Sequence, residues 1–355
     1  MLKSRISAAR ECLSRCGVEA LVVTHLPLVR YLTGFTGSDG AVVISATGQW
    51  FLTDSRYTTQ AAEEAAGFTQ VEYRGKLEGI TSLLRQLPAG RVGFEAEQVT
   101  VAFHRGLADA LPAVELVPLG AELDGLRMVK DAAEIRLLER SAELASTALL
   151  GILDRIRPGV SERELALELE FAMKRAGAEE KSFDFIVASG ERGALPHGRA
   201  SAKEIRSGEL VTIDFGSVCQ GYHSDETVTV AVGQPDERQR EVYRIVREAH
   251  DRAIDAVRPG VILKELDAVA RDFITQEGYG AYFGHGLGHG VGLEVHEKPT
   301  VSFRGEEALV EGMVFTIEPG IYIPGWGGVR IEDTVVVTGD GCRLLTRVPK
   351  DLLVL

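Results

Sequence analysis

Four acidic residues in the second half of the chain flank two hairpin loops, and this arrangement constrains the fold more than any other feature. Asp214 and Asp225 lie on either side of one loop, and Glu318 and Glu332 lie on either side of the other. Counting outward from each loop centre predicts that the two members of each pair face one another. Cross-strand neighbours have Cβ atoms only ~4.5–5.5 Å apart, where like charges are destabilising. Each pair therefore needs a positive partner.

A glycine-rich segment between the hairpins supplies a fifth candidate ligand. Glycine occupies every second position from Gly284 to Gly292, which excludes a stable helix and with it the helical His-Glu-x-x-His zinc motif. Such a density of glycine lets the backbone approach a ligand closely. Of the three histidines in this region we choose His289 as a metal ligand, and we expect His285 and His296 to be hydrogen-bonding groups around a substrate.

Four carboxylates and one imidazole, without thiolates, suit hard or borderline divalent cations such as Mn²⁺, Co²⁺, Fe²⁺ or Zn²⁺. Two such cations would balance the four negative charges. Together they can make a water acidic and polarise a carbonyl group, which predicts a metal-dependent hydrolase. Any one of these acids taken alone would be read as a solvated strand residue or a surface ion pair.

The remaining pattern divides the chain into two domains. The first 120 residues alternate helices with short strands, which predicts an α/β layer domain over residues 1–123. A long amphipathic helix is expected over 131–156, and an α+β domain over 124–355. The sequence Arg-Pro-Gly-Val occurs at 157–160 and again at 258–261, each time between two helices. This repeat predicts two related halves in the second domain.

Composition excludes several classes of function. The net charge is −13, from 52 acidic against 39 basic residues, and no long basic run is present, which argues against nucleic-acid and anionic-membrane surfaces. No stretch approaches the ~18 apolar residues of a membrane-spanning helix, and the N-terminus lacks a signal-peptide pattern, so the cytoplasm is the expected location. The four cysteines have neither zinc-ribbon spacing nor a disulfide framework.

The motifs around these residues resemble the M24 metallopeptidases, which include aminopeptidase P, prolidase and methionine aminopeptidase. The matching segments are Ile213-Asp214-Phe215-Gly216, Ser224-Asp225-Glu226-Thr227, the glycine-rich run from Gly288 to Glu297, Thr316-Ile317-Glu318-Pro319-Gly320 and Arg330-Ile331-Glu332-Asp333. Two N-terminal segments, 31–38 and 52–57, are similar to the creatinase/prolidase N-terminal domain, which methionine aminopeptidases lack. The resemblance implies a pita-bread catalytic domain, in which helices from two related halves back a curved antiparallel sheet.

The resemblance also implies a role for each ligand. Asp214 would bind one metal, Asp225 and Glu332 would bridge two metals, and His289 and Glu318 would bind the second. Because all five ligands are present, the metal-free creatinase-like branch is disfavoured. Two divalent ions per chain are expected, with Mn²⁺ preferred over Co²⁺ or Zn²⁺.

The substrate side of the site is implied in the same way. The predicted catalytic and substrate-binding residues are His197, His285, His296, Glu318, Arg330, Arg304 and Tyr322. The implied reaction is hydrolysis of the bond between an N-terminal residue and a following proline, in which Glu318 shuttles a proton and His296 helps to stabilise the oxyanion.

Substrate length stays open at this point. A Xaa-Pro aminopeptidase is the first expectation, with proline-containing peptides as substrates, and a Xaa-Pro dipeptidase (prolidase) is the alternative. Arg304 has the spacing of the prolidase arginine that binds the proline carboxylate, but aminopeptidase P has similar spacing, and Arg304 could equally be a surface residue beside Glu306 and Glu307. A non-catalytic peptide-binding protein on the same fold is a more distant alternative, and a homodimer is expected from the family.

Overall fold

A computed structural model describes residues 2–355, and these residues form two compact units that divide after Arg127. The predicted boundary after residue 123 and the division after Arg127 both fall within helix α6 (Ala121–Met128). Among residues 2–355, no helix has both the length and the apolar character needed to cross a membrane.

The first unit is a mixed sheet with helices, as the α/β prediction requires. Its strands are β1 (Ala20–Val23), β2 (Ala41–Ser45), β3 (Gln49–Thr53), β4 (Thr69–Glu72), β5 (Arg91–Glu95) and β6 (Glu115–Leu119). They form one six-stranded sheet in the order β4-β3-β2-β1-β5-β6. The other helices of the unit are α1 (Leu2–Cys16), α2 (Leu26–Thr33), α3 (Thr58–Glu64), α4 (Lys76–Leu84) and α5 (Val101–Ala110).

Helix α2 has a weak signal in the sequence pattern. Its sequence contains a proline near the start, which the first turn of a helix tolerates because that N–H has no partner within the helix. Gly34 ends the helix in a left-handed conformation, with φ of 86°. Eight residues with an early proline give too short a periodic pattern to distinguish from a loop.

The second unit contains four long helices and a series of short strands. The helices are α7 (Ala132–Leu150), α8 (Glu162–Ala176), α9 (Glu237–Ala256) and α10 (Leu263–Gln276), with short 3₁₀ turns η1 (Leu153–Arg155), η2 (Gly190–Ala194) and η3 (Gly280–Tyr282). The strands are β7 (Glu180–Lys181), β8 (Ile186–Ser189), β9 (Glu209–Phe215), β10 (Ser217–Cys219), β11 (Tyr222–His223), β12 (Glu226–Val232), β13 (Gly288–Gly290), β14 (Glu297–Val301), β15 (Val314–Ile317), β16 (Gly320–Ile323), β17 (Gly327–Arg330), β18 (Asp333–Val337) and β19 (Cys342–Leu344).

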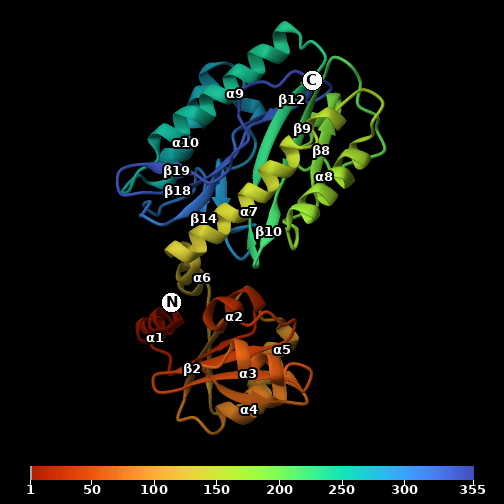
Figure 1. Cartoon of the computed structure of the whole chain (residues 1–355). Helices are drawn as coiled ribbons and strands as arrows, with labels where there is room; N and C mark the ends of the chain where they lie inside the picture. The colour runs from red at the N-terminus through yellow and green to blue at the C-terminus, as the bar shows by residue number, and fades with distance from the viewer. Residues whose placement is uncertain (1) are drawn as a thin grey trace. The chain divides into compact units, whose positions relative to one another are not determined.

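Two helix pairs cover the strands of this unit (Figure 1). Helices α7 and α8 share a buried apolar cluster with sheet β12-β9-β8, and α9 and α10 share another with sheet β14-β13-β15-β18-β19. Each helix pair is followed in the chain by one acidic hairpin, which is the order that the Arg-Pro-Gly-Val repeat predicts. Helix α8 begins with a capping box, in which the Ser161 side chain accepts from the backbone N–H of Glu164. The long helix expected over 131–156 instead ends as α7 at Leu150.

Candidate metal centre

The first acidic hairpin has a different register from the one that the sequence suggested. Strand β9 pairs with β12, and Asp214 lies opposite Thr227 rather than Asp225, so the expected direct pairing is wrong. Asp225 lies two residues before Thr227, between β11 and β12. Since side chains alternate along an extended chain, Asp225 still faces the same side as its neighbour Thr227, and both aspartates line one cavity.

The turn of this hairpin explains the difference. Cys219 pairs with Tyr222, so the turn residues are Gln220 and Gly221, at the end of the glycine-flanked loop and not at its middle. Both have positive φ, 47° and 76°, as a two-residue hairpin turn of the primed type requires. Their backbone N–H groups donate to the carboxylate of Glu179 at 2.9 and 3.0 Å. A residue distant in sequence therefore stabilises the turn.

The second hairpin has the predicted register. Strand β15 pairs with β18 through Ile317 and Asp333, and β16 pairs with β17 in the same register around Gly325. This places Glu318 opposite Glu332, at the break between the paired strands. Gly325 has φ of 74°, which a glycine adopts without strain. The predicted register of this hairpin around Gly325 is confirmed.

The glycine-rich segment forms the short strand β13, which lies between β14 and β15. The two glycines of this strand have no room for a side chain: a Cβ on Gly288 would lie 1.9 Å from the backbone oxygen of Thr316, and one on Gly290 would lie 2.2 Å from that of Lys298. Glycine therefore lets the neighbouring backbones approach His289 from both sides. The backbone N–H of His289 donates to Thr316 Oγ1 at 3.1 Å, which fixes the backbone from which the imidazole ring projects.

We expect Gly288→Ala to lower the free energy of unfolding of the second unit by about 2–3 kcal/mol or more, because overpacking against backbone cannot be relieved by a rotamer change. Urea unfolding followed by Trp326 fluorescence in a Trp50→Phe background measures this. Gly284→Ala is the matched control, since apart from its chain neighbours no atom of residues 2–355 lies within 4 Å of the added Cβ. Equal stability of the two variants would contradict the packing argument.

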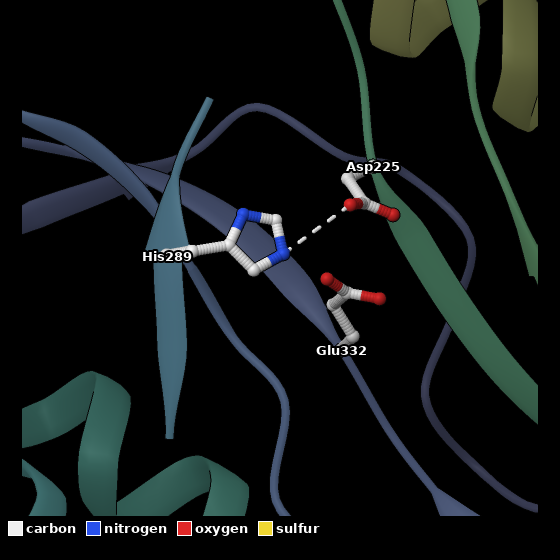
Figure 2. A group of neighbouring side chains, drawn as sticks. All are labelled: Asp225, His289 and Glu332. Atoms are coloured by element: carbon white, nitrogen blue, oxygen red, sulfur yellow. Dashed lines mark ion pairs between the residues drawn. The ribbon is translucent and has the colours of Figure 1, made fainter. Parts of the chain in front are cut away.

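The predicted ligands converge. Asp225, His289 and Glu332 each offer one ligand atom within 4.8 Å of the others, and Figure 2 shows their side chains pointing toward one another from three separate chain segments. His289 Nε2 lies 3.6 Å from Asp225 Oδ2 and 3.4 Å from Glu318 Oε1. A cavity of about 550 Å³ is lined by all five predicted ligands, together with Phe183, Asp184, Ile186, Pro196, His197, Arg199, His285, Gly286, Gly288, His296, Thr300, Ser302 and Arg330.

The electrostatics of this cavity fit cations. Asp225 and Glu332 are 4% and 2% exposed, and burial together with the surrounding carboxylates raises the pKa of both groups well above its ordinary value. Burial also raises the pKa of Glu318 and lowers the pKa of His289, which favours the neutral, ligating imidazole. Within residues 2–355, Asp214 Oδ1 and Asp225 Oδ1 are buried oxygens without a hydrogen-bond partner. Buried acceptors of this kind are what a divalent ion satisfies.

Arg330 connects the predicted ligand Asp214 to Tyr322. Its Nη2 donates to Asp214 Oδ2 at 2.5 Å and its Nη1 donates to the hydroxyl of Tyr322 at 2.9 Å. His285 Nδ1 donates to the Gly286 carbonyl at 2.8 Å, and because burial lowers the pKa of His285, its Nε2 is left to accept from Tyr322 at 2.9 Å. Tyr322, Arg330 and His285 therefore form one chain of hydrogen bonds that ends on the carboxylate of Asp214.

The other predicted substrate residues lie in different surroundings. His197 and His296 line the cavity, and the rings of His296 and His289 have centroids 4.2 Å apart. Arg304 is exposed and lies with its guanidinium 5.0 Å from the ring centroid of Phe303, outside the set of residues that line the cavity. Its role in binding a carboxylate stays a prediction.

Several cavity residues were missed by reasoning from sequence. Thr300 and Ser302 lie on and just after β14, and Phe183, Asp184 and Arg199 come from segments next to β8. None of these residue types carries a chemical signal by itself. Their only available signal is proximity in the chain to His197 and His296, which predicts the neighbourhood but not the side chain that points inward.

Comparisons with known proteins agree with this site. Residues 136–339 match metallopeptidase family M24, and residues 5–129 match the creatinase/prolidase N-terminal domain. A relative named Xaa-Pro dipeptidase from Pyrococcus horikoshii is 39% identical over 99% of both chains. A solved Xaa-Pro dipeptidase from Bacillus anthracis is 43% identical with a TM-score of 0.97 over 100% of both chains. A solved X-Pro aminopeptidase from Thermotoga maritima MSB8 is 39% identical with a TM-score of 0.91 over 99% of both.

The expected fold and family are thereby confirmed in both parts of the chain. The first unit is the creatinase/prolidase N-terminal domain, and the second is the catalytic domain of this family, which holds the acidic hairpins and a cluster of residues that could bind a metal ion. With both domains present and the relatives matched end to end, the chain belongs to metallopeptidase family M24 and is a metallo-exopeptidase.

Proposed function

We propose that this protein is a Xaa-Pro dipeptidase (prolidase) that uses two divalent metal ions. The observation that carries the proposal is the convergence of five donor residues from both hairpins and β13 in one cavity that three further histidines and two arginines also line. The substrate class is supported by relatives named Xaa-Pro dipeptidase, which match the chain over nearly its whole length. A cytoplasmic location and a homodimer belong to the same proposal.

The five predicted residues would hold the metals in the roles that the family pattern gives them. Asp225 and Glu332 would be shared between two ions, and Asp214, Glu318 and His289 would each bind one. When bound, divalent cations supply Lewis acidity for a carbonyl oxygen and make water acidic enough to ionise near neutral pH. Mn²⁺ is our first choice among the cations because carboxylate oxygens dominate the donor set.

The protein's own groups would perform the proton and charge transfers. Glu318 has a raised pKa and accepts a hydrogen bond from Thr316 Oγ1 at 3.3 Å, which places its Oε1 to hold a proton beside His289. His296 would donate to the oxyanion of the tetrahedral intermediate. Arg330 would fix the orientation of Asp214 by its contact with Oδ2. The leaving group is the secondary amine of proline, which must gain this proton to depart.

Substrate length is where our proposal departs from the first expectation. A cavity of about 550 Å³ lies within the common range for small ligands, and a proline dipeptide would be held almost entirely inside it. The similarity to the X-Pro aminopeptidase from Thermotoga maritima MSB8 supports a second candidate, in which longer peptides extend out of the cavity. The named dipeptidases give the first candidate the stronger support.

Kinetics on four peptides test the proposal. The metal-loaded protein is assayed with Mn²⁺, Co²⁺ or Zn²⁺ on Ala-Pro, Ala-Pro-Ala, Ala-Ala and Ala-Ala-Ala, and release of alanine is measured. We expect kcat/KM for Ala-Pro to exceed that for each of the other three by at least about 100-fold, ~2.7 kcal/mol. Comparable cleavage of Ala-Pro-Ala would establish the aminopeptidase instead, and no cleavage of either proline peptide would exclude both.

A further inference from the structure

The two acids proposed to bridge the metals are each followed by a second acid and a threonine. The sequences are Asp225-Glu226-Thr227 and Glu332-Asp333-Thr334. Glu226 and Asp333 begin strands β12 and β18, where successive side chains point to opposite faces. The first acid of each triplet faces the cavity, so the second faces away from it. Glu226 and Asp333, the rear acids, have no role in the proposed reaction.

One lysine joins the rear acids. Lys350 Nζ lies 2.6 Å from Glu226 Oε1 and 3.2 Å from Asp333 Oδ1. The three side chains are almost completely buried, with exposed fractions of 6% for Lys350, 1% for Glu226 and 3% for Asp333. Two buried acids that contact the same ammonium group would repel each other if that cation were absent. Lys350 therefore compensates the rear pair, as metal ions would compensate the front pair.

The segment around Lys350 holds both rear acids. Val348 N donates to Glu226 Oε1 at 2.9 Å, and Thr346 Oγ1 donates to Asp333 Oδ1. His250 Nε2 also lies 3.2 Å from Asp333 Oδ2. Residues 346–350 thus fasten strands β12 and β18, which come from different halves of the catalytic domain.

The threonines of the triplets complete the connection at the front. Thr227 Oγ1 donates to Glu332 Oε2 at 2.6 Å, and Thr334 Oγ1 donates to the backbone oxygen of Asp225 at 2.7 Å. The threonine of each triplet therefore bonds to the first acid of the other triplet. These first acids, Asp225 and Glu332, are the front acids. A change in the separation of the rear acids would move the front acids through one peptide unit on each strand.

We propose that Lys350 is a positioning residue for the metal centre: its ammonium group, held between Glu226 and Asp333, fixes the separation of Asp225 and Glu332. The inference rests on the proposed metal site of the preceding subsection, but not on the identity of the substrate. Groups that orient metal ligands from behind typically change metal affinity by about 10–100-fold when they are removed.

Metal binding to the full chain tests this role without substrate. Metal-free protein is titrated with Mn²⁺ by calorimetry and with Co²⁺ by visible absorption, and the melting temperature of each metal-free variant is recorded. We expect Lys350→Met to weaken Mn²⁺ binding by about 10–100-fold and to alter the Co²⁺ bands, and Lys350→Arg to recover most of both.

Lys203→Met is the matched control. Lys203 Nζ lies 2.7 Å from Glu209 at the start of β9, and neither residue contacts a predicted ligand. This variant should lower the melting temperature but leave Mn²⁺ affinity and Co²⁺ bands unchanged. Wild-type Mn²⁺ affinity and Co²⁺ bands in Lys350→Met would overturn the proposal.

A second variant covers the case in which Lys350→Met does not fold. Glu226→Gln keeps an oxygen for Val348 N and removes one charge, and we expect about 10-fold weaker Mn²⁺ binding. Unchanged affinity in Glu226→Gln would again refute the role of Lys350. Failure of the proposed dipeptidase would look different: the wild-type protein would bind Mn²⁺ and would not cleave Ala-Pro.

Discussion

Replacing Asp225 by asparagine is expected to release both divalent ions and to lower kcat/KM for Ala-Pro by at least about 10³-fold, ~4 kcal/mol. Asparagine preserves the size of the side chain but removes the charge that a shared ligand must supply. Burial is the main cause that raises the pKa of Asp225, and the negative charges of Glu332, Asp214 and Glu318 raise it further. In the metal-free protein this charge is unfavourable, so its removal should not destabilise the fold.

Two measurements separate this loss of metal from unfolding. Metal content by mass spectrometry should fall from two ions per chain to fewer than one, and the melting temperature of metal-free Asp225→Asn should equal or exceed that of the metal-free wild type. Glu162→Gln is the matched control, because Glu162 is a buried acid whose partners Ser189, Arg192 and Ser201 lie outside the predicted ligand set. Two ions retained in Asp225→Asn would exclude a shared ligand at this position.

The two hairpins show where sequence reasoning about the fold succeeds and where it stops. The glycine at the centre of the second loop, Gly325, does mark the turn, so simple counting places Glu318 opposite Glu332. In the first hairpin the turn lies instead at Gln220 and Gly221. The carboxylate of Glu179, 41 positions before Gln220, accepts a hydrogen bond from the backbone of this turn. Local composition cannot indicate a contact of that range.

The same limit applies to the site. Residue type and motif order were enough to select the five predicted ligands, because acids and an imidazole are costly to bury unless a cation compensates them. The hydrogen bonds of His285 and Arg330 to Tyr322, and of Lys350 to Glu226, depend on how distant strands pack. Glu226 and Lys350 are 124 residues apart, and an acid in a strand with a lysine near the C-terminus predicts nothing in isolation.

His296 offers the second large effect, and one that should leave the metals in place. His296→Ala is expected to lower kcat for Ala-Pro by about 10²–10³-fold, the usual result of removing one donor to an oxyanion. The side chain lines the cavity beside His289, and burial with this neighbour lowers the pKa of His296 to about 4, so the ring is neutral near pH 7 and has one N–H to donate. A neutral donor is compatible with cations nearby, whereas an imidazolium would be repelled.

Steady-state kinetics and metal analysis on the same samples decide this role for His296. Two ions per chain with a reduced kcat and a KM within about 3-fold of the wild type would place the loss in the transition state and not in substrate binding. His296→Gln is the matched variant, because an amide N–H can donate over a similar reach, and we expect it to recover at least about 10-fold of the lost kcat. A loss of metal from both variants would show that His296 positions the ligand His289 instead. An unchanged kcat in His296→Ala would show that His296 takes no part in the reaction.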